Sequence, residues 1–368
     1  MVGIASPHAY STALFARGGS PQLLREIREI DRLTRSSHVI PLYTLTHLCT
    51  VAKVPYEAAR DIIFNHRAHY SARKLKKHSG KGFRTIHAPS AHLKSLQLAI
   101  LENCLPKRPT SDLSYAYESR RNTLEAARRH VGAKTMIQLD LADFFGSISS
   151  SAMYKTFVGF GYPKLLAFEM SLISSVGHEV TLRGPDEKGV VYELLKSGRL
   201  PQGASTSGKL SNLVCIGLDQ LLGEVATRWG GVITRYADDI TFSTGHAVSR
   251  SECNSILRDL KGAIHVSGFT MNERKTRVTR SGQEHRVLGL CVGQDSVWLN
   301  RNYKNSIRAH LYGLEKNGLA DHGIHRGFSS DQEFMSFIWG HYAYCVYVDP
   351  DFGAEMRARL ELAGVERV

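Results

Sequence analysis

Two acidic residues, Asp238 and Asp239, stand side by side between two runs of strand-forming residues. Residues 230–234 precede them and residues 240–243 follow, so the pattern predicts a β-hairpin with both carboxylates at its turn. Adjacent carboxylates repel each other, and a divalent cation removes that repulsion. Because Mg²⁺ prefers oxygen ligands, paired acids on a turn indicate a magnesium site.

A third acid, Asp140, ends another strand-like run, residues 135–140. If that strand lies beside the hairpin, Asp140 faces Asp238 and Asp239. Three carboxylates on neighbouring strands could hold two Mg²⁺ ions, which is what in-line phosphoryl transfer requires. Each feature alone also has an ordinary structural explanation, because Asp is common in turns.

These acids and several other residues resemble the motifs of reverse transcriptases. Residues 236–239, Tyr-Ala-Asp-Asp, are similar to the family's Tyr-x-Asp-Asp box, and residues 200–203, Leu-Pro-Gln-Gly, are similar to its Pro-Gln-Gly box. Residues 272–276 resemble the lysine motif that comes next, and the motifs keep the family's order. The resemblance implies an α+β fold, a right-hand polymerase with fingers, a palm of antiparallel sheet plus helices, and a helical thumb.

The resemblance also implies roles for individual residues. Asp140, Asp238 and Asp239 would be the catalytic, metal-binding acids, with Asp239 in a weaker or structural contact. Phe145 would screen the sugar 2′ carbon and favour deoxynucleotides, and Gln202 would line the nucleotide and template site. The phosphates of the incoming nucleotide would meet basic side chains, namely Arg84, Lys275 and, joining Arg84, Lys76 or Lys77. Ordinary alternatives are an exposed lysine, a core aromatic residue and a turn glutamine.

Within the family, the sequence is most similar to the bacterial retron branch. Residues 70–101 resemble the retron fingers, and residues 335–350 resemble a retron thumb. Two branch signatures are incomplete, because residues 126–130 lack an expected Asn and residues 287–289 have Leu in place of Thr.

The retron resemblance implies an RNA-directed DNA polymerase that uses dNTPs to copy a structured noncoding RNA. The primer would be a guanosine 2′-OH in that RNA, so the DNA product would be RNA-linked. An accessory effector protein and a role in antiphage defence are implied as well. The alternatives are a reverse transcriptase of the group II intron or abortive-infection type, and an RNA-binding scaffold without turnover.

The composition agrees with a partner that is a polyanion. The chain has 368 residues, 42% of them hydrophobic, which supports a sizeable core and two or three subdomains. Its formal net charge is +13, and this favours either nucleic acid or an anionic membrane surface. Basic residues gather at 73–84, 274–280 and 301–308, and three such clusters around an acidic palm favour a phosphate-binding channel.

The cysteines and the apolar runs bear on the cellular compartment of the protein and on its association with membranes. Six cysteines are scattered without a C-x-x-C pair, which predicts reduced buried thiols in a cytoplasmic protein and not a zinc site. No secretory signal is visible, and no run approaches the ~18 apolar residues of a membrane span, so no membrane partner is expected.

The periodicity of the sequence predicts four parts. Helical patterns dominate the N-terminal part, and the motifs place the fingers and palm after it. Residues 183–189 are predicted to be a polar loop, residues 205–229 one long helix, and residues 287–292 a strand. The predicted division is 1–69 N-terminal helical region, 70–134 fingers, 135–294 palm and 295–368 thumb.

Overall fold

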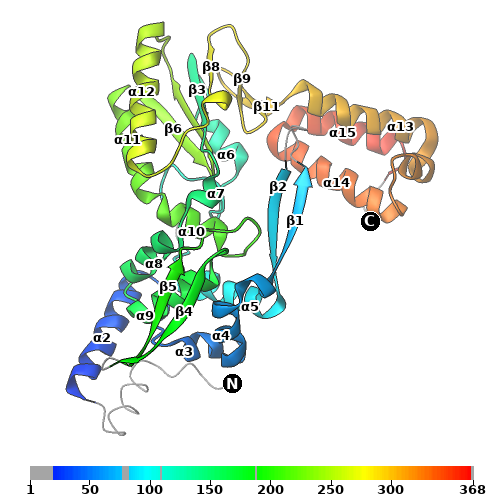
Figure 1. The fold of residues 1–368 in the computed structure, drawn as a ribbon. Helices are drawn as coiled ribbons and strands as arrows, with labels where there is room; N and C mark the ends of the chain where they lie inside the picture. The colour runs from blue at the N-terminus through cyan, green and yellow to red at the C-terminus, as the bar shows by residue number, and fades with distance from the viewer. Residues whose placement is uncertain (1–19, 77–82, 108–109, 187–188, 366–368) are drawn as a thin grey trace.

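The computed structural model describes residues 20–76, 83–107, 110–186 and 189–365. The fold is α+β and has the right-hand polymerase arrangement of fingers, palm and helical thumb (Figure 1). In this view the N-terminal helices lie at the lower end, the palm sheet stands above them, and the last three helices form a bundle to one side.

The palm is a four-stranded antiparallel sheet with the strand order β6-β7-β3-β8. Side chains alternate between the two faces of a strand. Ile137 and Leu139 therefore join the apolar core on one face, whereas Gln138 and Asp140 point to the other. The strands are β3 (Thr135–Asp140), β6 (Gly231–Tyr236), β7 (Asp239–Thr244) and β8 (Arg277–Arg280).

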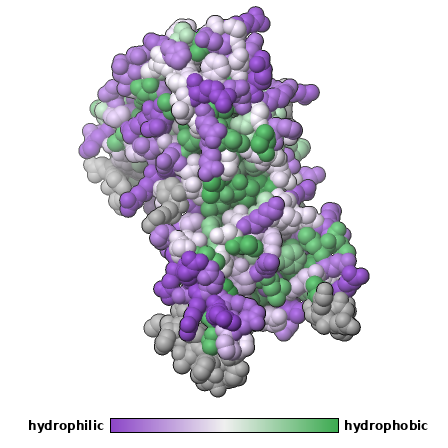
Figure 2. All heavy atoms as spheres, turned by 90° about the vertical axis from the view of Figure 1, so that its left-hand side faces the viewer, coloured by the Kyte–Doolittle hydropathy of each residue, from purple (hydrophilic) through white to green (hydrophobic). Residues whose placement is uncertain are grey.

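Helices α11 (Ile216–Arg228) and α12 (Arg250–Val266) cover the apolar face of the sheet. Ser249 begins α12 with a capping box, in which the Ser249 side chain and Glu252 satisfy each other's backbone N–H groups. Figure 2 views the molecule from this side and shows mainly hydrophilic residues in its upper part, where these helices lie. Both helices are thus amphipathic covers of the palm.

The predicted long helix over 205–229 is wrong, because the structure divides it at Cys215 into α10 (Ser207–Val214) and α11. Helix α10 packs against α8 (Ser150–Gly159), whereas α11 packs against β6. The two helices pack against different neighbours, and the local periodicity does not predict that difference.

The predicted polar loop at 183–189 is also wrong. It falls in the distal part of a hairpin formed by β4 (Glu179–Asp186) and β5 (Gly189–Lys196), with residues 187 and 188 outside the described part. Val180 and Tyr192 of this hairpin pack on the main core. Gly, Pro and charged residues favour a turn locally, but Arg183 and Asp186 pair with Val191 and Gly189 of the partner strand, with an irregularity between them.

The predicted strand over 287–292 is interrupted. Leu288 and Gly289 both have positive φ, so they form the turn between two short strands. The small sheet contains β9 (His285–Val287), β10 (Leu290–Val292) and β11 (Val297–Leu299).

A two-stranded ribbon projects from the body beside α5 (Figure 1). It consists of β1 (Tyr70–Lys76) and β2 (Phe83–Pro89), paired in continuous register from Tyr70↔Pro89 to Lys76↔Phe83. Every residue of β1 after Tyr70 is exposed, so this strand contributes little to the core.

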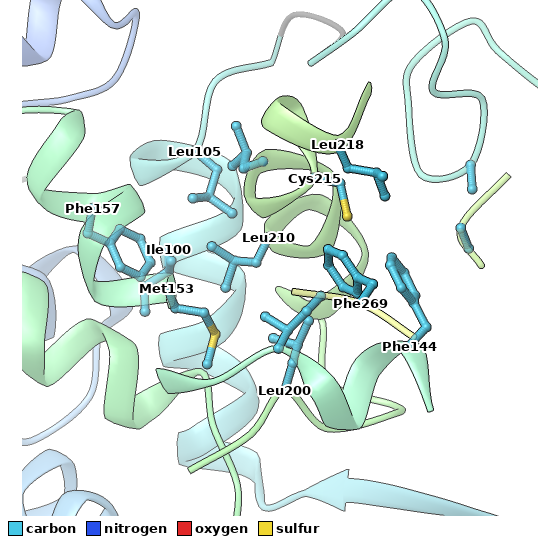
Figure 3. Close-up of a cluster of buried hydrophobic side chains, with 14 of the residues drawn as sticks. Ile100, Leu105, Phe144, Met153, Phe157, Leu200, Leu210, Cys215, Leu218 and Phe269 are labelled. Atoms are coloured by element: carbon cyan, nitrogen blue, oxygen red, sulfur yellow. The ribbon is translucent and has the colours of Figure 1, made fainter. Parts of the chain in front are cut away.

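Two apolar cores hold the molecule together. The main core runs from Val39 in the N-terminal region to Phe269 beyond the palm sheet, and Figure 3 shows part of it around Leu210 and Met153. The second core joins α6 and β9–β11 to the last three helices. The main core contains residues from both sides of the predicted domain bounds at 69/70 and 134/135. The packing does not separate domains at these positions, so the bounds remain predictions.

The remaining elements complete the two cores. The N-terminal and fingers helices are α2 (Pro21–Ser36), α3 (Leu45–Ala52), α4 (Tyr56–Phe64), α5 (Ala91–Ala99) with the π-turn Ile100–Cys104, and α6 (Thr123–Arg128). Helices α7 (Phe144–Ser147) and α9 (Lys164–Ile173) follow β3, and short 3₁₀ turns cover His66–His69 and Glu273–Lys275. The thumb helices are α13 (Arg301–His325), kinked at Gly318, α14 (Asp331–Val348) and α15 (Pro350–Leu362).

Across the ranges that the structure describes, no helix combines the length and the apolar character needed to cross a membrane.

Candidate active site

The two acidic segments of the sequence meet at one edge of the palm. Asp140, the last residue of β3, is the cross-strand partner of Asp239, the first residue of β7. Asp238 precedes it in the two-residue turn between β6 and β7. As the sequence predicted, Asp140 ends the strand next to the hairpin, and strand alternation turns its carboxylate away from the apolar core.

The turn that carries Asp238 is strained and is pinned on both sides. Ala237 has a φ of 56°, a conformation that costs a residue other than glycine about 1 kcal/mol or more. On one side, the Leu141 backbone N–H donates to the Asp238 carbonyl at 2.9 Å. On the other, the Arg235 guanidinium donates to the Ala237 carbonyl at 3.3 Å. The surrounding structure therefore determines the position of the turn.

Arg235 itself belongs to a buried polar network beneath the hairpin. It is fully buried, and its Nη2 donates to Asp219 Oδ2 at 2.8 Å. Its Nη1 donates to the side-chain oxygen of Asn212 at 3.1 Å. Asn212 in turn donates to Glu118, which also accepts from Lys209 at 2.8 Å. Buried charges need such partners, because an unpaired charge in the interior is very costly.

Asp140 is held by the lysine motif. Its Oδ2 accepts from Lys275 Nζ at 2.7 Å, and its Oδ1 accepts from the Asn272 side-chain amide at 3.1 Å. The Asn272 backbone N–H also donates to the Asp140 carbonyl at 2.7 Å. The segment after the 3₁₀ turn continues as β8 beside β3, which explains why residues 132 and 135 positions apart meet here.

The negative charge at this edge is only partly compensated, because Lys275 pairs with Asp140 alone. Although the Asp239 residue is exposed as a whole, partial loss of hydration around its carboxylate raises its pKa to about 6, and repulsion from Asp238 and Asp140 adds to the shift. The pKa of Asp238 is raised as well, again mainly by desolvation. A divalent cation would relieve this repulsion, so the donor set has the chemistry that suits Mg²⁺.

Within the described part of the chain, no group of three or more His, Cys, Asp or Glu side chains is already arranged around a metal position. The ammonium of Lys275 bonds directly to Asp140, and the Asp239 residue is exposed. A cation would therefore compete with Lys275 for the Asp140 carboxylate.

A cleft of about 670 Å³ opens in front of these acids. Its walls contain six of the residues predicted from the sequence: Arg84, Asp140, Phe145, Gln202, Asp238 and Lys275. Asp239 and Lys76 are not among the lining residues, and Lys77 lies outside the described residues. Among the predicted nucleotide-binding residues that the structure describes, all line this one cavity except Lys76 at the end of β1.

The Pro-Gln-Gly segment is fastened to the ribbon. The His87 backbone N–H on β2 donates to the Gln202 carbonyl at 2.7 Å. Gly203 has a φ of 111°, and a Cβ on it would lie 2.8 Å from the His87 carbonyl. Glycine is required here for both reasons. The contact places Gln202 and Arg84, three residues before His87 on β2, on the same cleft.

One of the three basic clusters is largely neutralised within the protein. Lys304 pairs with Asp349 at 2.6 Å, and Arg308 pairs with Glu355 at 2.7 Å. These ion pairs join α13 to the start of α15. The expectation that residues 301–308 line a phosphate channel is therefore not supported for Lys304 and Arg308, which instead stabilise the thumb.

Three features of the site escaped the sequence-based prediction. Asn272 holds Asp140, Arg235 supports the turn, and Tyr117 lines the cleft at a φ of 58°. Asn272 is the first residue of the lysine motif and Arg235 directly precedes the Tyr-x-Asp-Asp box, so their motif context was an available signal. Tyr117 had none, because nothing in its local pattern places it beside Phe145, 28 positions later.

The sequence of the chain is similar to known proteins over most of its length. Residues 75–292 match the family model described as reverse transcriptase (RNA-dependent DNA polymerase). The chain is 30% identical over 305 residues to the retron Ec86 reverse transcriptase of Escherichia coli, covering 81% of this chain and 85% of that protein. It is 32% identical over 247 residues to the retron Mx65 reverse transcriptase of Myxococcus xanthus, covering 66% and 56% of the two chains.

Solved structures with a similar course of the chain include a telomerase from Candida albicans and a foamy viral protease-reverse transcriptase. The telomerase aligns with a TM-score of 0.44 at 12% identity, over 80% of this chain and 54% of that one. The viral protein aligns with a TM-score of 0.44 at 15% identity, over 81% and 40%.

Proposed function

The chain belongs to the reverse transcriptase family and is an RNA-directed DNA polymerase of the retron type, and we propose that it copies a structured noncoding RNA into DNA that stays linked to that RNA. The primer in this proposal is a guanosine 2′-OH of the same RNA. The substrates are dNTPs, and the RNA and its DNA product are the partners of the protein.

One observation carries the proposal for the active site. Asp140 and Asp238 line one cleft together with Arg84, Gln202 and Lys275, and Asp239 is the cross-strand partner of Asp140. Acids at one end of the cleft and cations on its walls suit a nucleoside triphosphate whose reacting phosphate lies near the acids.

Reverse transcriptases in general use divalent metal ions. In the proposed site Asp140 and Asp238 hold Mg²⁺, with Asp239 beside them in a weaker contact. When bound, two such ions lower the pKa of the primer hydroxyl and neutralise charge on the triphosphate.

The residues of the chain position the substrates for attack of the primer oxygen on the α-phosphate, from which pyrophosphate leaves. Arg84 presents a planar guanidinium that can bind phosphate oxygens in pairs, while Lys275 supplies a point charge. Phe145 closes the cleft below the sugar, where a 2′-OH would meet its ring. Gln202 orients the nucleotide from the wall that is fastened to β2.

The decisive test of the enzyme is primer extension with purified protein, RNA template-primer, Mg²⁺ and dNTPs. We expect the Asp238→Ala, Asp239→Ala variant to lose synthesis by about 10³-fold or more, because it removes the charge that holds the metal. The same variant should keep RNA binding and a normal unfolding midpoint. Equal synthesis by variant and wild type would exclude the mechanism.

The linked product is tested by sequencing the nucleic acid that copurifies with the protein. DNA joined to RNA through a branch supports the retron-type reaction. RNA alone, from a wild-type protein that extends added primers, would instead show a polymerase that uses a different primer.

We also propose a cytoplasmic role in antiphage defence together with an accessory effector protein. All six cysteines are free and buried, which suits a reducing compartment. The test is the plating efficiency of phages on cells that carry the coding region with its neighbouring genes. Protection should disappear with Asp238→Ala, and equal plating on both strains would overturn this part of the proposal.

A further inference from the structure

We propose that Tyr117 is a positioning residue for Phe145 and thereby sets how strongly the enzyme rejects ribonucleotides. The inference rests on the proposed function, because it takes Phe145 as the ring that meets the sugar. Tyr117 belongs to none of the motifs that identify the family, and its contribution emerges only from its place in the structure.

The two rings are in direct contact. The centroid of Tyr117 lies 6.2 Å from that of Phe145, with an angle of 64° between the planes. On its other side, Phe145 contacts the buried ring of Phe144, with centroids 5.3 Å apart. Such edge-to-face contacts are favourable. Phe145 is therefore held between a fixed ring in the core and the ring of Tyr117 at the cleft.

Tyr117 also stands at a boundary between two cavities. It lines the main cleft together with Asp238, and it lines a neighbouring pocket of about 340 Å³. Arg84, Phe145 and Gln202 contribute to both cavities. Tyr117 remains 54% exposed, so it presents a ring to the substrate space and is not an ordinary core aromatic residue.

The backbone around Tyr117 is held in a costly conformation. Its φ is 58°, which a tyrosine rarely adopts. Asn212 Nδ2 donates to the Ala116 carbonyl at 2.7 Å and to Glu118 Oε1 at 3.0 Å. Both neighbours of Tyr117 are thus fixed by one buried side chain. Strained residues that persist in such surroundings are typical of functional sites.

Helix α10 supports the ring from below. A Cβ on Gly208 would lie 2.5 Å from the Tyr117 ring, so the ring packs directly on the backbone of the first turn of α10. The glycine therefore offers a way to displace the Tyr117 ring without changing Tyr117 itself.

The test is single-nucleotide incorporation by the full chain on its RNA template-primer, comparing kcat/KM for a dNTP and for the ribonucleotide with the same base. We expect Tyr117→Ala to lower the dNTP/rNTP ratio by about 10-fold, mainly through better use of the ribonucleotide. Tyr117→Phe keeps the ring and should restore the ratio to within about 2-fold of wild type.

Gly208→Ala provides the independent variant. It should lower the dNTP/rNTP ratio in the same direction, because the added methyl group displaces the Tyr117 side chain, whose Cγ would lie 2.5 Å from it. Gly217→Ala in α11 is the matched control, since a Cβ there meets nothing within 4 Å. Thermal unfolding of each variant establishes that it is folded.

An unchanged dNTP/rNTP ratio in folded Tyr117→Ala, with wild-type DNA synthesis intact, would overturn the inference and leave the proposed function standing. Absence of DNA synthesis by the wild-type protein would overturn the proposed function and this inference with it.

Discussion

The palm sheet and the β1–β2 ribbon are both antiparallel β-structure, but they present their functional groups in opposite ways. In the palm, Asp140 has side-chain and backbone partners, and the Asp238 turn is pinned from two sides. On the ribbon, Arg84 and Lys76 lie on exposed strands that contribute little to either core. The acids therefore have a position determined by packing, whereas the cations of the ribbon are free to adjust to a ligand.

This difference has a chemical reason. Acids that repel one another come close together only where the fold holds them. Burial at this position also raises the pKa of Asp238. Cations on an exposed strand stay hydrated and are ordered only when a phosphate binds, which costs side-chain entropy. Variants of the buried groups that support the palm acids should therefore change stability, and variants in the ribbon should change substrate binding.

The largest expected effect is on the buried pair beneath the hairpin. Arg235→Met leaves the Asp219 carboxylate buried without its partner, so the free energy of unfolding should fall by about 3–5 kcal/mol. The double variant Arg235→Met, Asp219→Leu removes both charges and should recover most of that loss. Urea unfolding measures both values. A loss below about 1 kcal/mol in the single variant would contradict the described role of the pair.

The next effect belongs to the ribbon. Arg84→Ala should raise the KM for dNTPs by about 10- to 100-fold, because it removes a charge-assisted contact to the triphosphate. Its free energy of unfolding should stay within about 0.5 kcal/mol of wild type. Arg73→Ala on the neighbouring strand is the matched control, since Arg73 does not line the cleft. Equal KM values in the two variants would assign the phosphate contact elsewhere.

The stability of the protein should depend on pH, because His130 is buried against the palm strands β6 and β7. The ring nitrogens of His130 bond to Ser243 and Thr234, and burial lowers its pKa to about 3. Between pH 3 and about 6.5 the unfolded chain binds a proton that the folded protein excludes. The stability contribution is complete above about pH 6.5 and is lost as the pH falls, by at most about 1.4 kcal/mol per pH unit.

The measurement is the free energy of unfolding between pH 7.5 and pH 5. His130→Asn should reduce the slope without abolishing it, because burial also lowers the pKa of His66 and of His310 to about 4, and the same change at the exposed His92 on α5 should leave the slope as in the wild type. A wild-type stability that does not decrease below pH 6.5 would show that the His130 site accepts a proton without cost.

The smallest effect is expected for Lys76. This residue ends the described part of β1 and does not line the cleft. Lys76→Ala should change kcat/KM by less than about 2-fold at physiological ionic strength, where exposed charges are screened. A loss of kcat/KM as large as that of Arg84→Ala would show that Lys76 also contacts the nucleotide, and Lys76 and Arg84 would then have the same role.

Local patterns predicted much of the fold. The strands before Asp140 and around Asp238 and the helices of the N-terminal part agree with the structure, because each depends on residue type and periodicity over a short stretch. The failures share a cause as well. The hairpin over 179–196, the break at Cys215 and the turn at Leu288 depend on which distant element each segment packs against.

By itself, the sequence determined the kind of chemistry, because the types, order and spacing of Asp140, Gln202, Asp238 and Lys275 are properties of the chain. Only the tertiary structure decided which other residues serve that chemistry. Arg235 supports the turn through Asp219, and Tyr117 meets Phe145 on the backbone of Gly208. These contacts join segments that lie far apart in the chain, and side-chain packing between such segments has no signature in the local pattern of either one.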